Sequence, residues 1–125
     1  MSYFSSGEPG EGSLRVERGD SLRSFEVAPG VVLKPLLGDT MNINVVELAP
    51  DANTGVHVHN EEQMGYVVSG TLEFTDGNER WQLEPGDTYH ALPRVPHGAV
   101  AGPDGATVVD AFTPPRAGIR EMLES

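Results

Sequence analysis

The chain has 125 residues and a mass of 13.4 kDa, which suits one compact domain. Acidic residues outnumber Lys and Arg by 19 to 8, and the formal net charge of -11 repels phosphate backbones and anionic headgroups, so we expect neither nucleic-acid nor membrane binding. The absence of cysteine excludes disulfides, thiolate catalysis and sulfur-ligated metals. The N-terminal residues lack the pattern of a signal peptide, and we expect a cytoplasmic protein.

The first 20 residues are rich in Gly, Ser and acidic side chains and show no periodicity. We predict a flexible arm over residues 1–20 and a single domain over residues 21–125. From Val31 to Phe112, short apolar runs alternate with turn signals. About nine or ten strands at this spacing predict an all-β fold, a closed or double-sheet antiparallel barrel.

The predicted strands include VVLKPLL, INVVEL, VHVH and TYHAL, and turns are predicted at Ser69-Gly70 and over residues 102–105. Asp76-Gly77 lies between TLEFT and ERWQL. This dipeptide predicts a hairpin, because both residues tolerate positive φ. After Pro114-Pro115, the segment AGIREMLES predicts a short C-terminal helix.

A pair of histidines, His57 and His59, is separated by one residue. On a strand, positions i and i+2 face the same side, so both rings can reach one ion. An isolated pair of this kind is ordinarily a surface feature. Here the pair is followed by Gln63 and Gly70, and the sequence EPGD precedes His97 further on.

These residues resemble the two motifs of the cupin superfamily, G-x5-H-x-H-x3-4-E-x6-G and G-x5-P-x-G-x2-H-x3-N, over residues 31–112. The resemblance implies a jelly-roll fold, a small antiparallel double-stranded β-barrel. It also implies one divalent metal held by four side chains: His57, His59, Gln63 and His97.

The chain departs from the cupin motifs at several positions. The leading glycine of the first motif would fall at Pro50 or Asp51, and Gln63 stands where most members have Glu. His90 competes with His97 when the spacing is counted literally from the PGD sequence. The form P-x-x-V-P-H-G favours His97, and we assign His90 no role.

The amide of Gln63 influences the expected chemistry. Three neutral imidazoles and a neutral amide leave the full dipositive charge on the metal, which favours Lewis-acid chemistry, although redox oxygen chemistry stays open. A solvated turn residue is the alternative interpretation of Gln63. These ligands accept Mn, Fe, Co, Ni, Cu or Zn, so the identity of the metal is left open.

A second group of residues follows in VVDAFTPPR, where Asp110 and Phe112 share one face of a predicted strand and favour a cavity. The wider pattern, from H-x-H-x3-Q to D-x-F-T-P-x-R, is similar to KdgF-type pectin-degradation cupins and, less tightly, to bacilysin-pathway isomerase cupins. The first resemblance implies that Asp110, Phe112 and Arg116 lie beside the metal. It also implies conversion of 4,5-unsaturated uronates to linear ketonized sugars.

We expect Asp110 to move a proton and the planar guanidinium of Arg116 to bind a substrate carboxylate. A solvated arginine is the alternative for Arg116. Tyr66 and Trp81 are candidates for the cavity wall, although sheet packing explains either, and Tyr66 is kept as a candidate substrate contact.

The expected function is a metal-dependent isomerase or tautomerase that acts on a small carboxylated or sugar-like molecule. A metal-dependent dioxygenase, lyase or polyketide cyclase, and a non-catalytic ligand-binding cupin, stay open as alternatives. Cupins of this kind usually dimerise, and we expect a homodimer.

Overall fold

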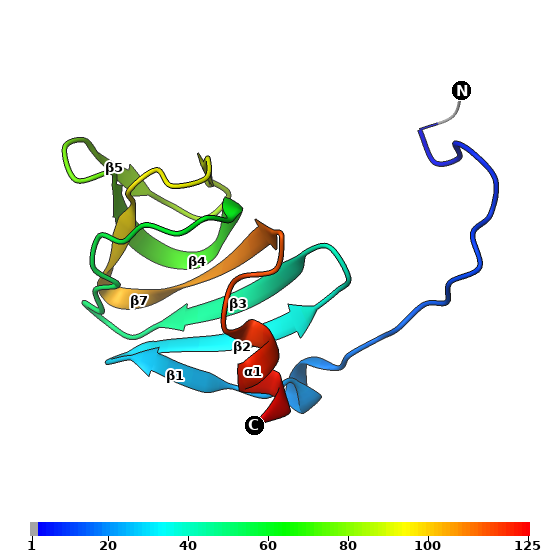
Figure 1. The fold of residues 1–125 in the computed structure, drawn as a ribbon. Coiled ribbons are helices and arrows are strands. Elements are labelled where there is room, and N and C mark those ends of the chain that lie inside the picture. The colour runs from blue at the N-terminus through cyan, green and yellow to red at the C-terminus, as the bar shows by residue number, and fades with distance from the viewer. Residues whose placement is uncertain (1–2) are drawn as a thin grey trace.

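The structure, a computed structural model, describes residues 3–125. Within these residues seven strands form one antiparallel sheet in the order β1, β2, β3, β7, β4, β5, with β6 paired to β4. Figure 1 shows that the sheet curls into an open barrel, with β1 and β5 at its two ends. The strands are β1 (Phe25–Ala28), β2 (Val31–Leu37), β3 (Asn42–Leu48), β4 (Glu62–Thr75), β5 (Arg80–Leu83), β6 (Thr88–Ala91) and β7 (Gly98–Thr113).

Most predicted elements are present, and the all-β fold is confirmed. The runs VVLKPLL and INVVEL form β2 and β3, which pair so that Val31 lies opposite Leu48. The predicted hairpin joins β4 to β5, with Thr75 opposite Arg80. Its turn is held by Asp76, whose Oδ1 accepts hydrogen bonds from two backbone N–H groups, and these bonds lower the pKa of that carboxyl.

Seven strands replace the nine or ten that we expected from the sequence. Two expected strands are lost because β4 and β7 continue through the predicted turns, at Ser69-Gly70 and over residues 102–105. The expected strand VHVH forms only an isolated bridge, whereas β1 lies before the region where strands were expected. Their ladder shifts register between Val67 and Ser69 and again between Gly70 and Leu72. Gly70 has φ +72°, and a Cβ there would lie 2.1 Å from the carbonyl oxygen of Gly105. These glycines therefore bend a long strand and allow a close approach.

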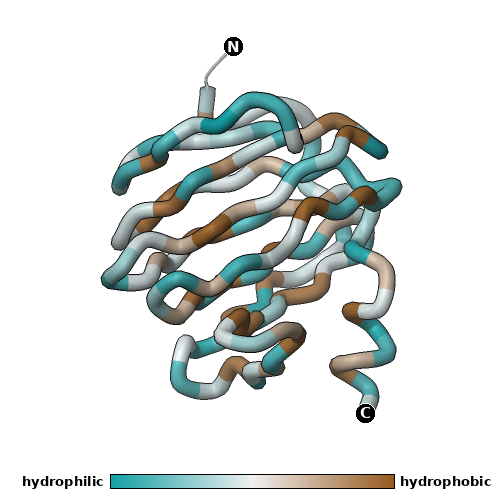
Figure 2. The backbone as a smooth tube through the Cα atoms, turned by 90° about the vertical axis from the view of Figure 1, so that its left-hand side faces the viewer, coloured by the Kyte–Doolittle hydropathy of each residue, from teal (hydrophilic) through white to brown (hydrophobic). Residues whose placement is uncertain are grey.

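The core lies between the two halves of the curled sheet. Inward and outward positions alternate along the strands, which Figure 2 shows as alternating apolar and polar segments. On β3, for example, Val46 and Leu48 are buried and Glu47 is exposed. The buried apolar cluster consists of Val31, Val46, Leu48, Ala52, Val67, Leu72, Ala101, Ala106 and Val108.

The two ends of the chain differ in their structure. The predicted C-terminal helix is present as α1 (Ile119–Glu124), anchored by Ile119, which is 2% exposed. Residues 3–18 form neither helix nor strand, and the first part of this segment extends away from the barrel (Figure 1), whereas Arg15 donates a hydrogen bond to the carbonyl oxygen of Leu37 on β2. The flexibility of the arm stays a prediction. A short 3-10 helix, Gly19–Ser21, precedes β1. Among the described residues, no helix is long and apolar enough to cross a membrane.

Candidate metal centre

The segment that carries the first two histidines is not the regular strand that we expected. His57 forms an isolated β-bridge with His97, through hydrogen bonds from His57 N to His97 O (2.9 Å) and from His97 N to His57 O (3.1 Å). His59 lies outside any strand, and its carbonyl accepts a hydrogen bond from the backbone N–H of Arg94. Backbone pairing between two loops of the same chain, rather than strand periodicity alone, therefore brings the histidines together.

Backbone carbonyls orient all three imidazole rings in the same way. The Nδ1 atom of each ring lies within 3.1 Å of a carbonyl oxygen two residues away in the chain. Because a carbonyl oxygen can only accept, Nδ1 carries the hydrogen and Nε2 keeps its lone pair. The pairs are His57 with Gly55, His59 with Glu61, and His97 with Val95.

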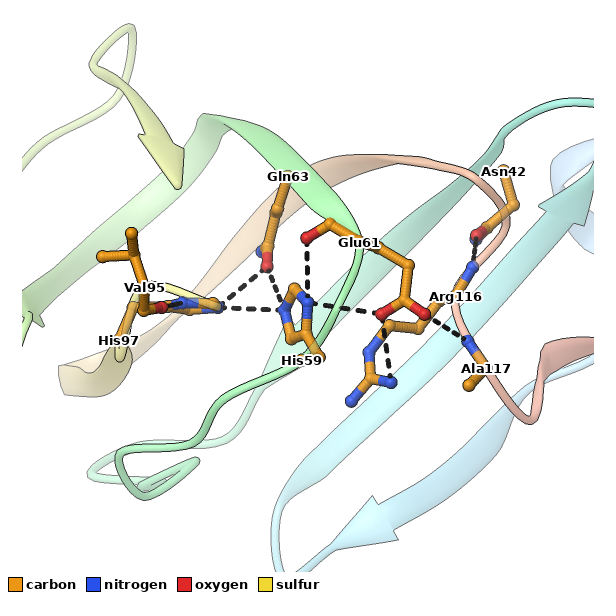
Figure 3. Close-up of polar contacts among 8 residues, drawn as sticks. All are labelled: Asn42, His59, Glu61, Gln63, Val95, His97, Arg116 and Ala117. Atoms are coloured by element: carbon orange, nitrogen blue, oxygen red, sulfur yellow. Dashed lines mark hydrogen bonds and ion pairs between the residues drawn. The ribbon is translucent and has the colours of Figure 1, made fainter. Parts of the chain in front are cut away.

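The Nε2 atoms of His59 and His97 converge with the amide oxygen of Gln63 (Figure 3). Gln63 Oε1 lies 3.0 Å from His59 Nε2 and 2.9 Å from His97 Nε2, and the two Nε2 atoms are 3.1 Å apart. One ligand atom from each histidine, His57 included, lies within 4.8 Å of the others. Acceptors repel one another at such distances unless a cation lies among them. Ligands about 2.1 Å from an ion and at right angles are roughly 3.0 Å apart, so the spacing of the Gln63, His59 and His97 atoms suits one divalent ion.

The carboxylate of Asp110 sets the orientation of the Gln63 amide, on the side away from the imidazoles. Gln63 lies on β4 opposite Phe112 of β7, and the neighbouring pair in the same ladder is Gly65 with Asp110. The amide group of Gln63 hydrogen-bonds the Asp110 carboxylate, which can accept but not donate when ionised. The NH2 group therefore faces Asp110, and Oε1 faces the imidazoles.

Burial favours the neutral form of two of the imidazoles, those of His59 and His97. His59 is 9% exposed and His97 4% exposed, and burial is the main cause that lowers the pKa of each below its usual value. Neutral rings with free Nε2 lone pairs are the form that binds a metal ion.

Asp110 is a buried carboxyl beside this cluster. Its Oδ1 accepts a 2.5 Å hydrogen bond from the hydroxyl of Tyr89. Burial raises the pKa of Asp110 to about 6, while hydrogen bonds from Tyr89 and Gln63 oppose the rise. Burial and the adjacent carboxylate raise the pKa of Tyr89 far above its usual value, so that its hydroxyl stays a donor. A carboxyl with a pKa near neutrality is suited to accept and return a proton.

The histidines, Gln63 and Asp110 line a cavity of about 270 Å³. Phe112 is buried in its wall, with its ring 5.7 Å from that of His59. Arg116 reaches the same cavity from the segment after β7, and about a third of its side chain is exposed. Seven residues singled out from the sequence thus share one cavity: His57, His59, Gln63, His97, Asp110, Phe112 and Arg116.

Tyr66, expected as a substrate contact, does not line this cavity. On β4, Gln63, Gly65 and Val67 occupy buried, inward positions, so the alternation of the strand directs Tyr66 outward, where it is 50% exposed. Trp81 lies outside the cavity as well. His90, to which we assigned no role, pairs on the surface with Glu62, at 2.6 Å.

Three residues that contact the site were not identified from the sequence: Tyr89, Glu61 and Asn42. A signal existed for Glu61, because it continues the two-residue spacing of His57, His59 and Gln63. Asn42 occupies an inward position of β3, where the alternation predicts an apolar residue. Tyr89 carried no such signal, since only the pairing of β6 with β4 brings it to Asp110.

Comparison with known proteins assigns the family. Residues 44–112 match the cupin domain. The chain belongs to the cupin family. The pectin degradation protein KdgF of Dickeya dadantii is 31% identical over 94 residues, which are 74% of this chain and 86% of that protein. The solved structure of KdgF from Halomonas sp. is 31% identical and superposes with a TM-score of 0.75, over 84% of this cupin and 96% of that chain.

A second known protein is similar over a shorter region of the cupin. The H2HPP isomerase of Bacillus subtilis is 40% identical over 63 residues, half of this chain but only 26% of that protein. The resemblance to cupins, and to KdgF among them, is therefore confirmed.

Proposed function

We propose that this cupin is a mononuclear metal-dependent isomerase of a small carboxylated or sugar-like molecule, in a ketonization-like reaction such as uronate ring opening. The observation that carries the proposal is the convergence of imidazole nitrogens and the Gln63 oxygen beside a buried Asp110. The similarity to KdgF and to an H2HPP isomerase supports the reaction class.

In this proposal the metal ligands are His57, His59, Gln63 and His97. All four are neutral, and Mn, Fe, Co, Ni, Cu and Zn all suit nitrogen and amide-oxygen donors. A divalent ion held there supplies a Lewis acid that polarises a hydroxyl or carbonyl oxygen of the substrate.

The other cavity residues bind the substrate and move its proton. The Asp110 carboxylate takes a proton from the substrate and returns it to the atom where the new C–H bond forms, which completes the isomerisation without a net change of oxidation state. Tyr89 holds Asp110 Oδ1 in place through its hydrogen bond. The guanidinium of Arg116 binds the substrate carboxylate, and Phe112 keeps water from the adjoining wall.

The test begins with metal analysis of protein purified without a nickel column. Protein stripped with EDTA is then reloaded with each candidate ion and assayed on 4,5-unsaturated uronates, by the loss of the ultraviolet absorbance of the unsaturated substrate. Turnover that requires one of the ions, and that is lost again with EDTA, supports the proposal.

Two other results would contradict the proposed isomerase and favour one of the alternative functions. Oxygen consumption by iron-loaded protein would point to the dioxygenase alternative. Ligand binding without turnover of any substrate would indicate a non-catalytic binding cupin.

We also propose a cytoplasmic homodimer with no nucleic-acid or membrane partner. The outer face of β4 supports the dimer, because Met64, Tyr66 and Val68 are about half exposed there. Light scattering measures the mass in solution directly, and a mass of 13.4 kDa would rule out the dimer.

A further inference from the structure

The buried carboxyl group of Glu61 lies between the His59 ring, on the side of the metal ligands, and the guanidinium of Arg116, in the cavity wall (Figure 3). The residue is 6% exposed, although acidic side chains are rarely so buried unless they are paired. Its Oε1 lies 3.3 Å from His59 Nδ1 and 3.5 Å from Arg116 Nη1. Within residues 3–125 this oxygen accepts no hydrogen bond of good geometry. Its burial is therefore compensated by the two groups that it faces.

The second oxygen of Glu61 holds the backbone that carries Arg116. Glu61 Oε2 accepts a 3.2 Å hydrogen bond from the N–H of Ala117. The preceding N–H, that of Arg116, donates a 2.7 Å hydrogen bond to Asn42 Oδ1. Asn42 is 1% exposed and is itself held by a hydrogen bond to Asn44. Two buried side chains thus fix the first residues after β7.

We propose that Glu61 is a positioning residue that serves both halves of this site: it supports the His59 ring at the metal and holds Arg116 in the cavity wall. Asn42 assists by fixing the same backbone segment. The role given to Arg116 rests on the proposed function, whereas the role at His59 needs only a bound metal.

The support that Glu61 gives to His59 follows from the geometry of the imidazole ring. The Nδ1–H group of His59 faces both the carbonyl oxygen of Glu61 and its carboxylate. A carboxylate on the far side of a metal-binding imidazole fixes the ring and raises the basicity of the nitrogen that binds the metal.

The contact of Glu61 with Arg116 is compatible with substrate binding because of the shape of the guanidinium. A guanidinium presents several N–H groups in a planar fork, so one Nη can face Glu61 while the other edge stays available to a substrate carboxylate. The exposure of about a third of the Arg116 side chain leaves such an edge reachable from the cavity.

The test compares Glu61→Gln with the matched control Glu62→Gln, which makes the same chemical change at the adjacent, partly exposed residue that pairs with His90. Zn²⁺ affinity is measured by competition with a chromophoric chelator. We expect Glu61→Gln to weaken binding by about 10-fold or more, and Glu62→Gln to match the wild type.

The order of the Arg116 side chain is measured separately, in metal-free protein, by NMR relaxation of its Nε–H group. We expect the order parameter to fall in Glu61→Gln and to stay unchanged in Glu62→Gln. If Glu61→Gln does not fold, Glu61→Asp replaces it, because it keeps the charge but withdraws the carboxylate by one methylene. The same two changes are expected for that variant.

An unchanged Zn²⁺ affinity overturns the role at His59, and an unchanged order parameter overturns the role at Arg116. Neither measurement uses turnover. An absence of isomerase activity would therefore count against the proposed function without being mistaken for a failure of this inference.

Discussion

Tyr89 donates its hydroxyl hydrogen to Asp110 across Gly65, which lies opposite both residues in the sheet. A Cβ at Gly65 would lie 2.1 Å from atoms of the Tyr89 ring. The ring also stacks on Phe74, with centroids 4.4 Å apart. The absence of a side chain at Gly65 therefore makes the room through which Tyr89 reaches the carboxylate.

We predict that Tyr89→Phe shifts the pH dependence of turnover. The substitution removes a hydrogen bond to the ionised form of Asp110, and so its pKa rises. A hydrogen bond to a charged group contributes roughly 1.5–3 kcal/mol, which corresponds to about one to two pH units. The acid limb of the kcat profile should move to higher pH by that amount. Tyr66→Phe, on the outer face of β4, should leave the profile in place, and identical profiles for both variants would contradict the prediction.

Gly65→Ala should destabilise the protein through a steric conflict with Tyr89. Overpacking of this kind costs about 1–3 kcal/mol, measured here by urea unfolding. Tyr89→Ala removes the ring, so in that background Gly65→Ala should cost far less. Additive costs in the double variant would show that the ring of Tyr89 is not the source of the conflict.

The buried carboxyl of Asp110 should make the stability of the metal-free protein depend on pH. Its pKa rises from an ordinary 3.8 to about 6 in the folded state, so the native state holds this proton more tightly than the unfolded chain. The stabilisation is complete below pH 3.8 and is lost as the pH rises through about 6. Relative to Asp110→Asn, the wild type should lose on the order of 3 kcal/mol between pH 3.5 and pH 7.5. A constant difference in unfolding free energy between the two proteins would refute the shift.

Kinetic constants should separate the roles of Asp110 and Arg116. Loss of a general base lowers rates by roughly 10²- to 10⁴-fold, and we expect Asp110→Asn to reduce kcat within that range with little change in KM. Arg116→Ala should mainly raise KM, and Arg116→Lys should not restore it, because an ammonium group lacks the planar fork. Arg120→Ala, on the exposed side of α1, serves as the control. Unchanged constants in both site variants would remove them from the mechanism.

Gln63→Glu should tighten metal binding and weaken catalysis. The new carboxylate adds a negative charge at the ion, and a gain of about 1.4 kcal/mol corresponds to a tenfold lower Kd in the chelator competition. The same change replaces the NH2 group that faces Asp110 by a carboxylate oxygen, and like charges raise the pKa of Asp110 further. Gln82→Glu adds the same charge on exposed β5 and should change neither quantity. Weaker metal binding by Gln63→Glu would argue against Gln63 as a ligand.

The composition of the chain and the spacing of its apolar runs and turn residues predicted the fold class well, because strands and turns leave short-range patterns in the sequence. Short apolar runs bounded by turn signals identified β2 and β3 almost to the residue, and Asp76-Gly77 identified the hairpin. The turn signals at Ser69-Gly70 and over residues 102–105 misled the strand count. A positive φ at glycine serves a bend within a strand as well as a reversal of the chain, and a local pattern does not distinguish the two.

The sequence by itself determined which kinds of atoms can bind a metal here, since it contains no cysteine and supplies His57, His59, Gln63 and His97 in the spacing of a cupin. Only the tertiary structure decided which groups surround those atoms. The contacts of Tyr89 with Asp110 and of Glu61 with Arg116 join residues 21 and 55 positions apart, as their numbers show. Strand register and loop pairing create such contacts, and neither is encoded in the local alternation of polar and apolar residues.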